Sequence, residues 1–414
     1  MGAARVRGLR LGVVAACSAG SGSAAGPLSP DFSTVPEAPG VTGSYVNNFF
    51  GYASSIDSAV ADIKTYATYD VGAANAAIAD GRKLPILWMA HGYSQDAGAI
   101  SDDMRVEAAR HGFVAVAPAM RGRQGGDGSA DDSCRELVDI EDAFQAVHDL
   151  YPTVVDIDRV HAWGFSGGCG NLVSFVAKHP GRIITAVGNF GWGDYGYSDV
   201  LGHSYWASGD NPTEVVNRIG PRSDLQPYLA RLALQNISAA MKQSNGQLWL
   251  FWDEDDDIGI CLRDVRGQLL ADGVPTSKWY ADESTAADDV RWEHGYPYTV
   301  PDLAQQANLI YRRVAEPAPT VASSGTIVVT GHCVHAAGFE VWTAATGVAN
   351  PKTHATGGQR FVATVTFNAN TRHFTVSRGC APLSPALDCA VRISMGGSAV
   401  THDVTSDGVT FDIP

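Results

Sequence analysis

A serine flanked by glycines lies between a strand-like and a helix-like segment. The pentapeptide Gly164-Phe165-Ser166-Gly167-Gly168 follows the apolar run VHAW and precedes NLVSFVAKHP. A serine on a tight turn between strand and helix presents its hydroxyl for nucleophilic attack, and glycines beside it avoid collisions with neighbouring backbone. The pentapeptide alone is weak evidence in a chain with 45 glycines. Its position between strand and helix predicts that Ser166 is a nucleophile.

A nucleophilic serine of this kind needs an acid and then a histidine later in the chain. The apolar run LWLFW leads into five carboxylates at residues 253–257, and α/β sheets build their sites at the C-terminal ends of such strands. We choose Asp255, the second position past the expected turn, and keep Asp256 and Asp257 as alternatives. A solvated acidic loop is the structural alternative. A calcium-binding loop is disfavoured because Ile258 stands where that loop requires glycine.

His294, in the segment RWEHGY, is the predicted base. It follows Asp255 in the chain, whereas His179 and His203 precede the acid and break the expected order. The other histidines precede Ser166 or lie in the C-terminal part of the chain. A lone histidine is more often structural than catalytic, but His294 fills the only position that the order leaves.

A second loop completes the predicted site. Residues 91–94, HGYS, follow the first central strand-like run LPILWMA. An oxyanion hole combines the amide after the nucleophile with an amide from this loop. We therefore expect the Gly167 and Tyr93 amides to be the two donors. His91 is expected to hold the loop and not to act as the base.

The elements that must position these residues alternate short apolar runs with helical stretches, from about residue 60 to 312. This alternation is typical of a mostly parallel sheet with helices on both faces. Ser133 and Glu136 form a capping box ahead of apolar residues at helical spacing, which predicts a helix there. We expect a doubly wound α/β domain over 46–315, with strands at 84–90, 113–117, 160–163, 184–187 and 248–252.

The C-terminal part has a different pattern. After the stiff segment EPAPT, short runs of alternating polar and apolar residues fill 320–414, which predicts a small β-sandwich. We expect a spacer or stability module. Binding of a polymer or cell-wall surface is the alternative, and Trp342, the only tryptophan in this part, gives it little support.

Residues 84–297 resemble the α/β-hydrolase superfamily, in the branch of dienelactone hydrolases, prolyl-oligopeptidase catalytic domains, and secreted polyhydroxybutyrate-depolymerase or feruloyl-type esterases. HGYSQD followed by GFVAVAPAMRG is similar to esterase members, and VDIDRVHAWGFSGG to esterases and oligopeptidases alike. The segment WDEDDDIG departs from the family, because it lacks the usual glycine-rich turn before the acid. The family roles of nucleophile, acid, base and two oxyanion donors carry over to Ser166, Asp255, His294, Tyr93 and Gly167.

The resemblance implies a serine hydrolase that needs no cofactor or metal, and we expect it to cleave small or polymeric carboxylic esters. Oligopeptidases place a propeller before the catalytic domain, but only about 60 residues precede it here, which favours esters over peptides. A propeller-less peptidase and a catalytically silent binding module remain alternatives. Substrate contacts, or else ordinary core positions, are expected for Trp192, Tyr195 and Tyr197.

Composition and the N-terminal segment bear on partners and location. The 44 acidic and 29 basic residues give a net charge of -15, which repels phosphate backbones and disfavours nucleic-acid partners. Residues 1–17, with three arginines before a short apolar run, read as an export signal, and 18–45 as a flexible linker. VAAC resembles a lipobox, so anchoring through a lipidated Cys17 stays open beside ordinary secretion.

Seven cysteines in an exported chain suggest disulfides. Apart from Cys17, three lie in each half of the chain, so complete pairing needs at least one bond between the halves. No CxxC pair occurs, so a tetrahedral metal site is not expected. The expected pairs are Cys380 with Cys389 and Cys134 with Cys169.

Overall fold

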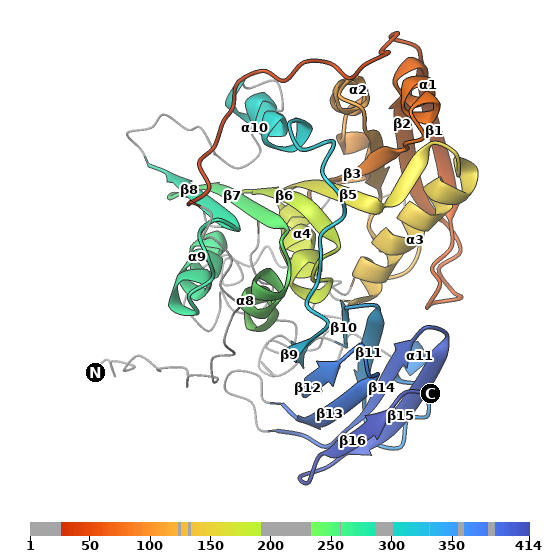
Figure 1. The fold of residues 1–414 in the computed structure, drawn as a ribbon, viewed down its shortest axis with the longest axis vertical. Coiled ribbons are helices and arrows are strands. Elements are labelled where there is room, and N and C mark those ends of the chain that lie inside the picture. Colours follow the sequence, from red (N-terminus) through yellow and green to blue (C-terminus); the bar gives the residue numbers. More distant parts are fainter. Residues whose placement is uncertain are drawn as a thin grey trace.

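The computed structural model describes residues 26–93, 95–122, 126–130, 134–191, 233–256, 258–285, 301–330, 332–354, 360–379 and 386–414. Across these residues, one eight-stranded sheet has the order β1-β2-β4-β3-β5-β6-β7-β8 (Figure 1). The six strands from β4 to β8 in this order are parallel to one another, whereas β2 is antiparallel to both β4 and β1. The strands are β1 (Tyr45–Tyr52), β2 (Ile63–Asp70), β3 (Leu84–Ala90), β4 (Val114–Pro118), β5 (Val155–Phe165), β6 (Ile183–Asn189), β7 (Gln247–Asp253) and β8 (Trp279–Ser284).

Helices cover both faces of this sheet, as the alternating pattern predicts. Every residue of β3 and β6 is buried, because a parallel sheet covered on both sides offers no wet face. One core cluster joins the sheet to α3, α4, α8 and α9, and another joins it to α2 and α10. The predicted α/β-hydrolase fold is confirmed. The helices are α1 (Val71–Ala79), α2 (Asp102–Arg110), α3 (Cys134–Leu150), α4 (Gly167–Lys178), α8 (Leu234–Gln243), α9 (Cys261–Ala271) and α10 (Pro301–Tyr311), with a short 3-10 turn η1 (Ala97–Ala99).

The helix predicted after Ser133, ahead of the strand that leads to Ser166, is α3. Leu137, Ile140 and Phe144 are buried along one side of it, as their helical spacing requires. Its predicted cap, Ser133, lies outside the described residues.

The segment expected to be a linker is described from residue 26 onward, and there it lies along the α/β domain. The Leu28 amide donates to the Thr276 carbonyl at 2.9 Å, and Arg312 donates to Asp31 at 2.7 Å. These contacts hold the segment against the loop before β8 and against the end of α10.

The C-terminal part is a β-sandwich, as predicted. Its two four-stranded sheets have the orders β10-β11-β14-β15 and β16-β13-β12-β9, with apolar side chains between them. A short helix, α11 (Pro351–His354), adjoins the first sheet. The strands are β9 (Ser324–Val329), β10 (Cys333–Ala336), β11 (Phe339–Ala344), β12 (Ala363–Asn368), β13 (His373–Arg378), β14 (Cys389–Met395), β15 (Ser398–Val404) and β16 (Val409–Asp412).

The sandwich packs directly on the helix layer that carries α4 and α8 (Figure 1). Lys178, at the end of α4 and only 1% exposed, donates to the Thr330 carbonyl at 2.9 Å. Gln243 of α8 donates to the Thr326 carbonyl at 3.1 Å. All twelve residues of α4 are buried, so the sandwich completes the burial of this helix.

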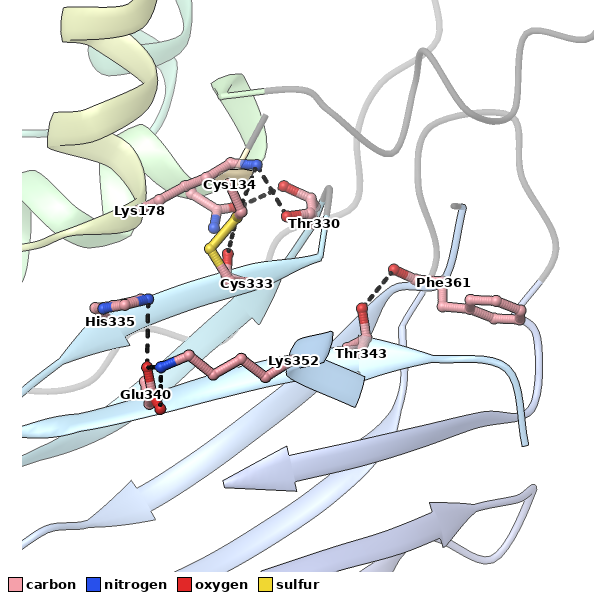
Figure 2. The surroundings of a disulfide bond; sticks show 10 residues. Cys134, Lys178, Thr330, Cys333, His335, Glu340, Thr343, Lys352 and Phe361 are labelled. Atoms are coloured by element: carbon pink, nitrogen blue, oxygen red, sulfur yellow. Dashed lines mark hydrogen bonds and ion pairs between the residues drawn. A yellow bond between two sulfur atoms is a disulfide. The ribbon is translucent and has the colours of Figure 1, made fainter. Parts of the chain in front are cut away.

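The cysteine pairing differs from the sequence expectation. Cys134 is bonded to Cys333 of β10 (Figure 2), so the predicted bond between Cys134 and Cys169 is wrong. The reason is the direction of the side chains. Cys169 belongs to the core under the sheet, where a Cβ added at Gly188 of β6 would lie 2.7 Å from its Sγ, whereas Cys134 faces the sandwich.

The predicted bond between Cys380 and Cys389 is also not formed. Cys389 is a buried free thiol in the core of the sandwich, and Cys380 lies outside the described residues. The expectation that pairing would cross between the two halves of the chain is met by Cys134 and Cys333.

Candidate active site

Ser166 occupies the tight turn between β5 and α4. Its backbone has φ 52° and ψ -123°, a conformation that costs a non-glycine residue about 1–3 kcal/mol. The turn is held from both sides, since the Ser166 amide donates to the Asn189 carbonyl at 3.0 Å and the Gly170 amide donates to the Ser166 carbonyl at 3.2 Å. Strain of this kind, stabilised by its surroundings, is what a strand–nucleophile–helix turn requires.

Close backbone approach explains the glycines around Ser166. A Cβ at Gly164 would lie 2.7 Å from the Gly168 carbonyl oxygen, and one at Gly168 would lie 2.2 Å from the Ala90 carbonyl oxygen. Both distances are too short for real atoms, so larger residues would push the turn out of shape. The glycine pattern therefore serves the geometry of the turn.

The HGYS loop lies against this turn. A Cβ at Gly167 would be 2.7 Å from the Tyr93 amide nitrogen, and one at Gly92 would be 3.6 Å from the Ser166 Cβ. The two peptides predicted to donate to an oxyanion are thus neighbours, close to the serine. His91 is buried, and its Nδ1 lies 2.8 Å from the Gly92 carbonyl oxygen, as expected for a residue that holds the loop.

The carboxylates of the acidic turn after β7 differ in how far they are buried. Asp253 is 7% exposed and accepts from the Ser284 hydroxyl at 2.6 Å and from the Asp255 amide at 2.9 Å. Asp255 itself is exposed, whereas Asp256 is partly buried. Asp256 accepts from the Ile258 amide at 2.9 Å.

The charge of Asp256 acts on Cys169, in the helix that follows the serine. The pKa of the Cys169 thiol is raised, mainly by burial and to a smaller extent by the charge of Asp256. Cys169 lies three residues after Ser166, in the first turn of α4, and a Cβ at Gly191 would contact both the Cys169 side chain and the Ser166 carbonyl oxygen. The carboxylate of Asp256 therefore acts electrostatically on the first turn of the nucleophile helix.

Several predicted site residues lie outside the described residues, namely His294, Trp192, Tyr195, Tyr197 and the alternative acid Asp257. Of the predicted set, the structure brings Ser166, Gly167 and Tyr93 together and leaves Asp255 exposed beside the more buried Asp256.

Sequence reasoning missed two residues that shape the site. Gln95 accepts from the Gly92 amide at 2.9 Å, and Ser284, at the end of β8, donates to Asp253. Gln95 lies in the HGYSQD segment, where a polar residue three positions past a glycine was the local signal for it. Ser284 belongs to no motif.

The described residues hold no group of three or more histidine, cysteine, aspartate or glutamate side chains placed to bind a metal ion. None of their helices is long and apolar enough to cross a membrane.

This chain is similar to known proteins in structure but not in sequence. No protein-family model and no curated protein matches the sequence. Similar solved structures include an esterase from Pyrococcus furiosus, with 14% identity over 68% of this chain and 98% of that chain and a TM-score of 0.43. Prolyl oligopeptidase B from Galerina marginata is 16% identical over 66% of this chain and 37% of that chain, with a TM-score of 0.47.

A third similar structure is a candidate dienelactone hydrolase from Klebsiella pneumoniae, 13% identical over 66% of this chain and 100% of that chain, with a TM-score of 0.42. Esterases, a dienelactone hydrolase and a prolyl oligopeptidase are the branches that the sequence resembles. No residue role in this chain depends on them.

Proposed function

We propose that this chain is a serine hydrolase that cleaves carboxylic esters, small or polymeric, with Ser166 as the nucleophile. The observation that carries the proposal is the backbone of Ser166, held at φ 52° between a strand and a helix with Gly167 packed against the Tyr93 amide. A strained serine beside two neighbouring backbone amides is suited to acyl transfer.

In the proposed reaction the Ser166 oxygen attacks the ester carbonyl carbon while His294 takes the hydroxyl proton. The Gly167 and Tyr93 amides stabilise the oxyanion, and the same histidine then protonates the leaving alkoxide. Water, deprotonated by His294, attacks the acyl-enzyme and releases the acid. The position of His294 in the chain, after the acidic turn, supports its role as the base.

For the acid we propose Asp256 in place of Asp255. A triad carboxylate is buried and hydrogen-bonded to the base, and Asp255 is exposed. Asp253 is buried, but its two oxygens already accept from Ser284 and from the Asp255 amide. Asp256 is partly buried, is held by the Ile258 amide, and acts on Cys169 near the serine.

Esters are the preferred substrate class on chemical grounds. An alkoxide leaves readily, whereas an amide nitrogen must be protonated while the peptide is held in register. The substrate is expected to contact Trp192, Tyr195 and Tyr197, which follow β6 in the chain. A peptidase activity and a catalytically silent binding module are the competing functions.

Export, with secretion or lipid anchoring at Cys17, remains part of the proposal, and so does binding of a polymer surface by the sandwich. The disulfide between Cys134 and Cys333 supports export, because disulfides persist in oxidising compartments.

The test is turnover of p-nitrophenyl esters of increasing chain length, beside a polyester film and a feruloyl sugar, by the wild type and Ser166→Ala. Activity in the wild type that Ser166→Ala abolishes supports the proposal. A wild type with no activity on any ester favours the silent binding module.

A further inference from the structure

Gln95 closes a small ring of hydrogen bonds around Gly92 in the HGYS loop. Its side-chain Oε1 accepts from the Gly92 amide at 2.9 Å, and its own amide donates to the Gly92 carbonyl at 3.2 Å. Gly92 is buried and Gln95 is exposed. A surface side chain therefore holds a buried peptide in place.

The Gly92 carbonyl belongs to the peptide unit whose other end is the Tyr93 amide. A trans peptide is planar, and its N–H points opposite to its C=O. The His91 ring at 2.8 Å and the backbone amide of Gln95 at 3.2 Å hold this carbonyl. The Gln95 side chain holds the other side of Gly92, by accepting from its amide. Fixing the carbonyl also fixes the direction in which the Tyr93 N–H points.

That direction matters because of where the peptide lies. The Tyr93 nitrogen is 2.7 Å from the position of a Cβ at Gly167, and Gly92 lies beside the Ser166 side chain. The Gly92 amide already donates to Gln95, so Tyr93 supplies the amide of this loop that we assign to the oxyanion.

We propose that Gln95 is a positioning residue that aims the Tyr93 amide at the oxyanion. This inference rests on the proposed function of Ser166. Oxyanion donors stabilise the transition state only when they are preorganised, so loss of the brace lowers kcat and leaves KM largely unchanged. A merely structural Gln95 would lower the melting temperature and leave kcat unchanged.

The test compares Gln95→Ala and Gln95→Glu with the wild type on one short-chain p-nitrophenyl ester. Removing a whole oxyanion donor costs about 10²- to 10³-fold in kcat. Gln95→Ala removes only the side-chain bond to the Gly92 amide and keeps the backbone bond to the Gly92 carbonyl, so we expect it to cost about 10-fold. Asp96→Asn is the matched control, because Asp96 accepts from the Gly98 amide at 2.8 Å in the same loop and does not touch Gly92. It should stay within about twofold of the wild type.

Gln95→Glu gives a second measurement, the pH dependence of kcat, which would not change if Gln95 had only a structural role. A glutamate can still accept from the Gly92 amide, but its negative charge opposes a nearby oxyanion. We therefore expect the ratio of its kcat to the wild-type kcat to fall as pH rises through the ordinary glutamate pKa, about 4.3. The ratio cancels the titration of the base and of the loop's own His91 and Asp96. The ratio for Gln95→Ala should not change with pH.

Circular dichroism at each pH confirms that the variants are folded. A wild-type kcat in Gln95→Ala, or a pH-independent ratio in Gln95→Glu, overturns the inference while the proposed function stands. Full ester turnover by Ser166→Ala rejects the proposed function, and the role of Gln95 falls with it.

Discussion

Cys134, the first residue of α3, is disulfide-bonded to Cys333 of the β-sandwich across a sequence separation of 199 residues. The bond lies beside the buried Lys178, which donates to Thr330 (Figure 2). The α/β domain and the sandwich are therefore joined covalently at a packed interface. The sandwich covers α4, the helix that follows Ser166.

Loss of this bond should destabilise the protein. In the chain-entropy model a loop of this length contributes about 5 kcal/mol, an upper figure because the denatured state retains structure. The double variant Cys134→Ser/Cys333→Ser should have a lower melting temperature than the wild type in calorimetry. A reducing agent should lower the wild-type melting temperature and leave that of the double variant unchanged. Equal melting temperatures for oxidised wild type and double variant would contradict a stabilising bond.

The same interface should make stability depend on pH. His179 lies at the end of α4, with its ring centroid 4.4 Å from that of His335 in β10. Burial first, and then His335, Arg182 and Lys178, lowers the pKa of His179 well below its usual range. The unfolded chain then binds more protons below about pH 6.5, so the free energy of unfolding falls as pH drops from about 7 to 5.

Chemical denaturation of the wild type and His179→Gln at pH 7 and pH 5 measures this dependence. The variant should lose less stability between the two pH values than the wild type. His373→Gln, on an exposed position of β13, is the control and should keep the wild-type difference. An unchanged pH difference in His179→Gln would show that His179 does not contribute.

The acid of the triad can be identified by isosteric substitution. Asp256→Asn should lower kcat on the order of 10⁴-fold, because the base loses the carboxylate that orients it. Asp255→Asn should retain most activity, since its side chain is exposed. Steady-state kinetics on a p-nitrophenyl ester decide between them. An inactive Asp255→Asn beside an active Asp256→Asn would contradict this assignment and identify Asp255 as the acid, as the sequence predicts.

Ester cleavage should exceed peptide cleavage by orders of magnitude. We expect measurable kcat/KM on short-chain p-nitrophenyl esters and little on X-Pro or X-Ala p-nitroanilides, because the anilide needs protonation of its leaving nitrogen. Both substrate types release a chromophore, so one spectrometer assay compares them. Similar kcat/KM values on the best ester and a dipeptidyl anilide would favour the peptidase.

How far the sequence predicts the structure depends on how local the determining contacts are. The turn at Ser166 is predictable because the glycines that it needs are its own neighbours in the chain. The acid is harder, since Asp253, Asp255 and Asp256 differ only in how the turn directs them. Ser284, from the next strand, fixes Asp253 at 2.6 Å, and no local pattern reveals that contact.

The disulfide was beyond local reasoning for a related reason. Cys169 is close to Cys134 in the sequence order of elements, but the phase of α4 points it under the sheet, toward Gly188. The partner of Cys134 comes from a domain whose docking site on α4 and α8 has no sequence motif. The alternating strands predict the sandwich itself, but its packing against these helices is a tertiary property.

Covalent labelling of Ser166 tests the central claim most directly. A fluorophosphonate reacts only with a serine that its surroundings activate, and intact-mass measurement followed by peptide mapping locates the adduct. We predict one equivalent of label on the peptide that contains Ser166, competition by a short-chain ester, and no label on Ser166→Ala. A folded wild-type protein that takes up no label, or takes it up equally after Ser166→Ala, would contradict the proposal that Ser166 is the nucleophile of a serine hydrolase.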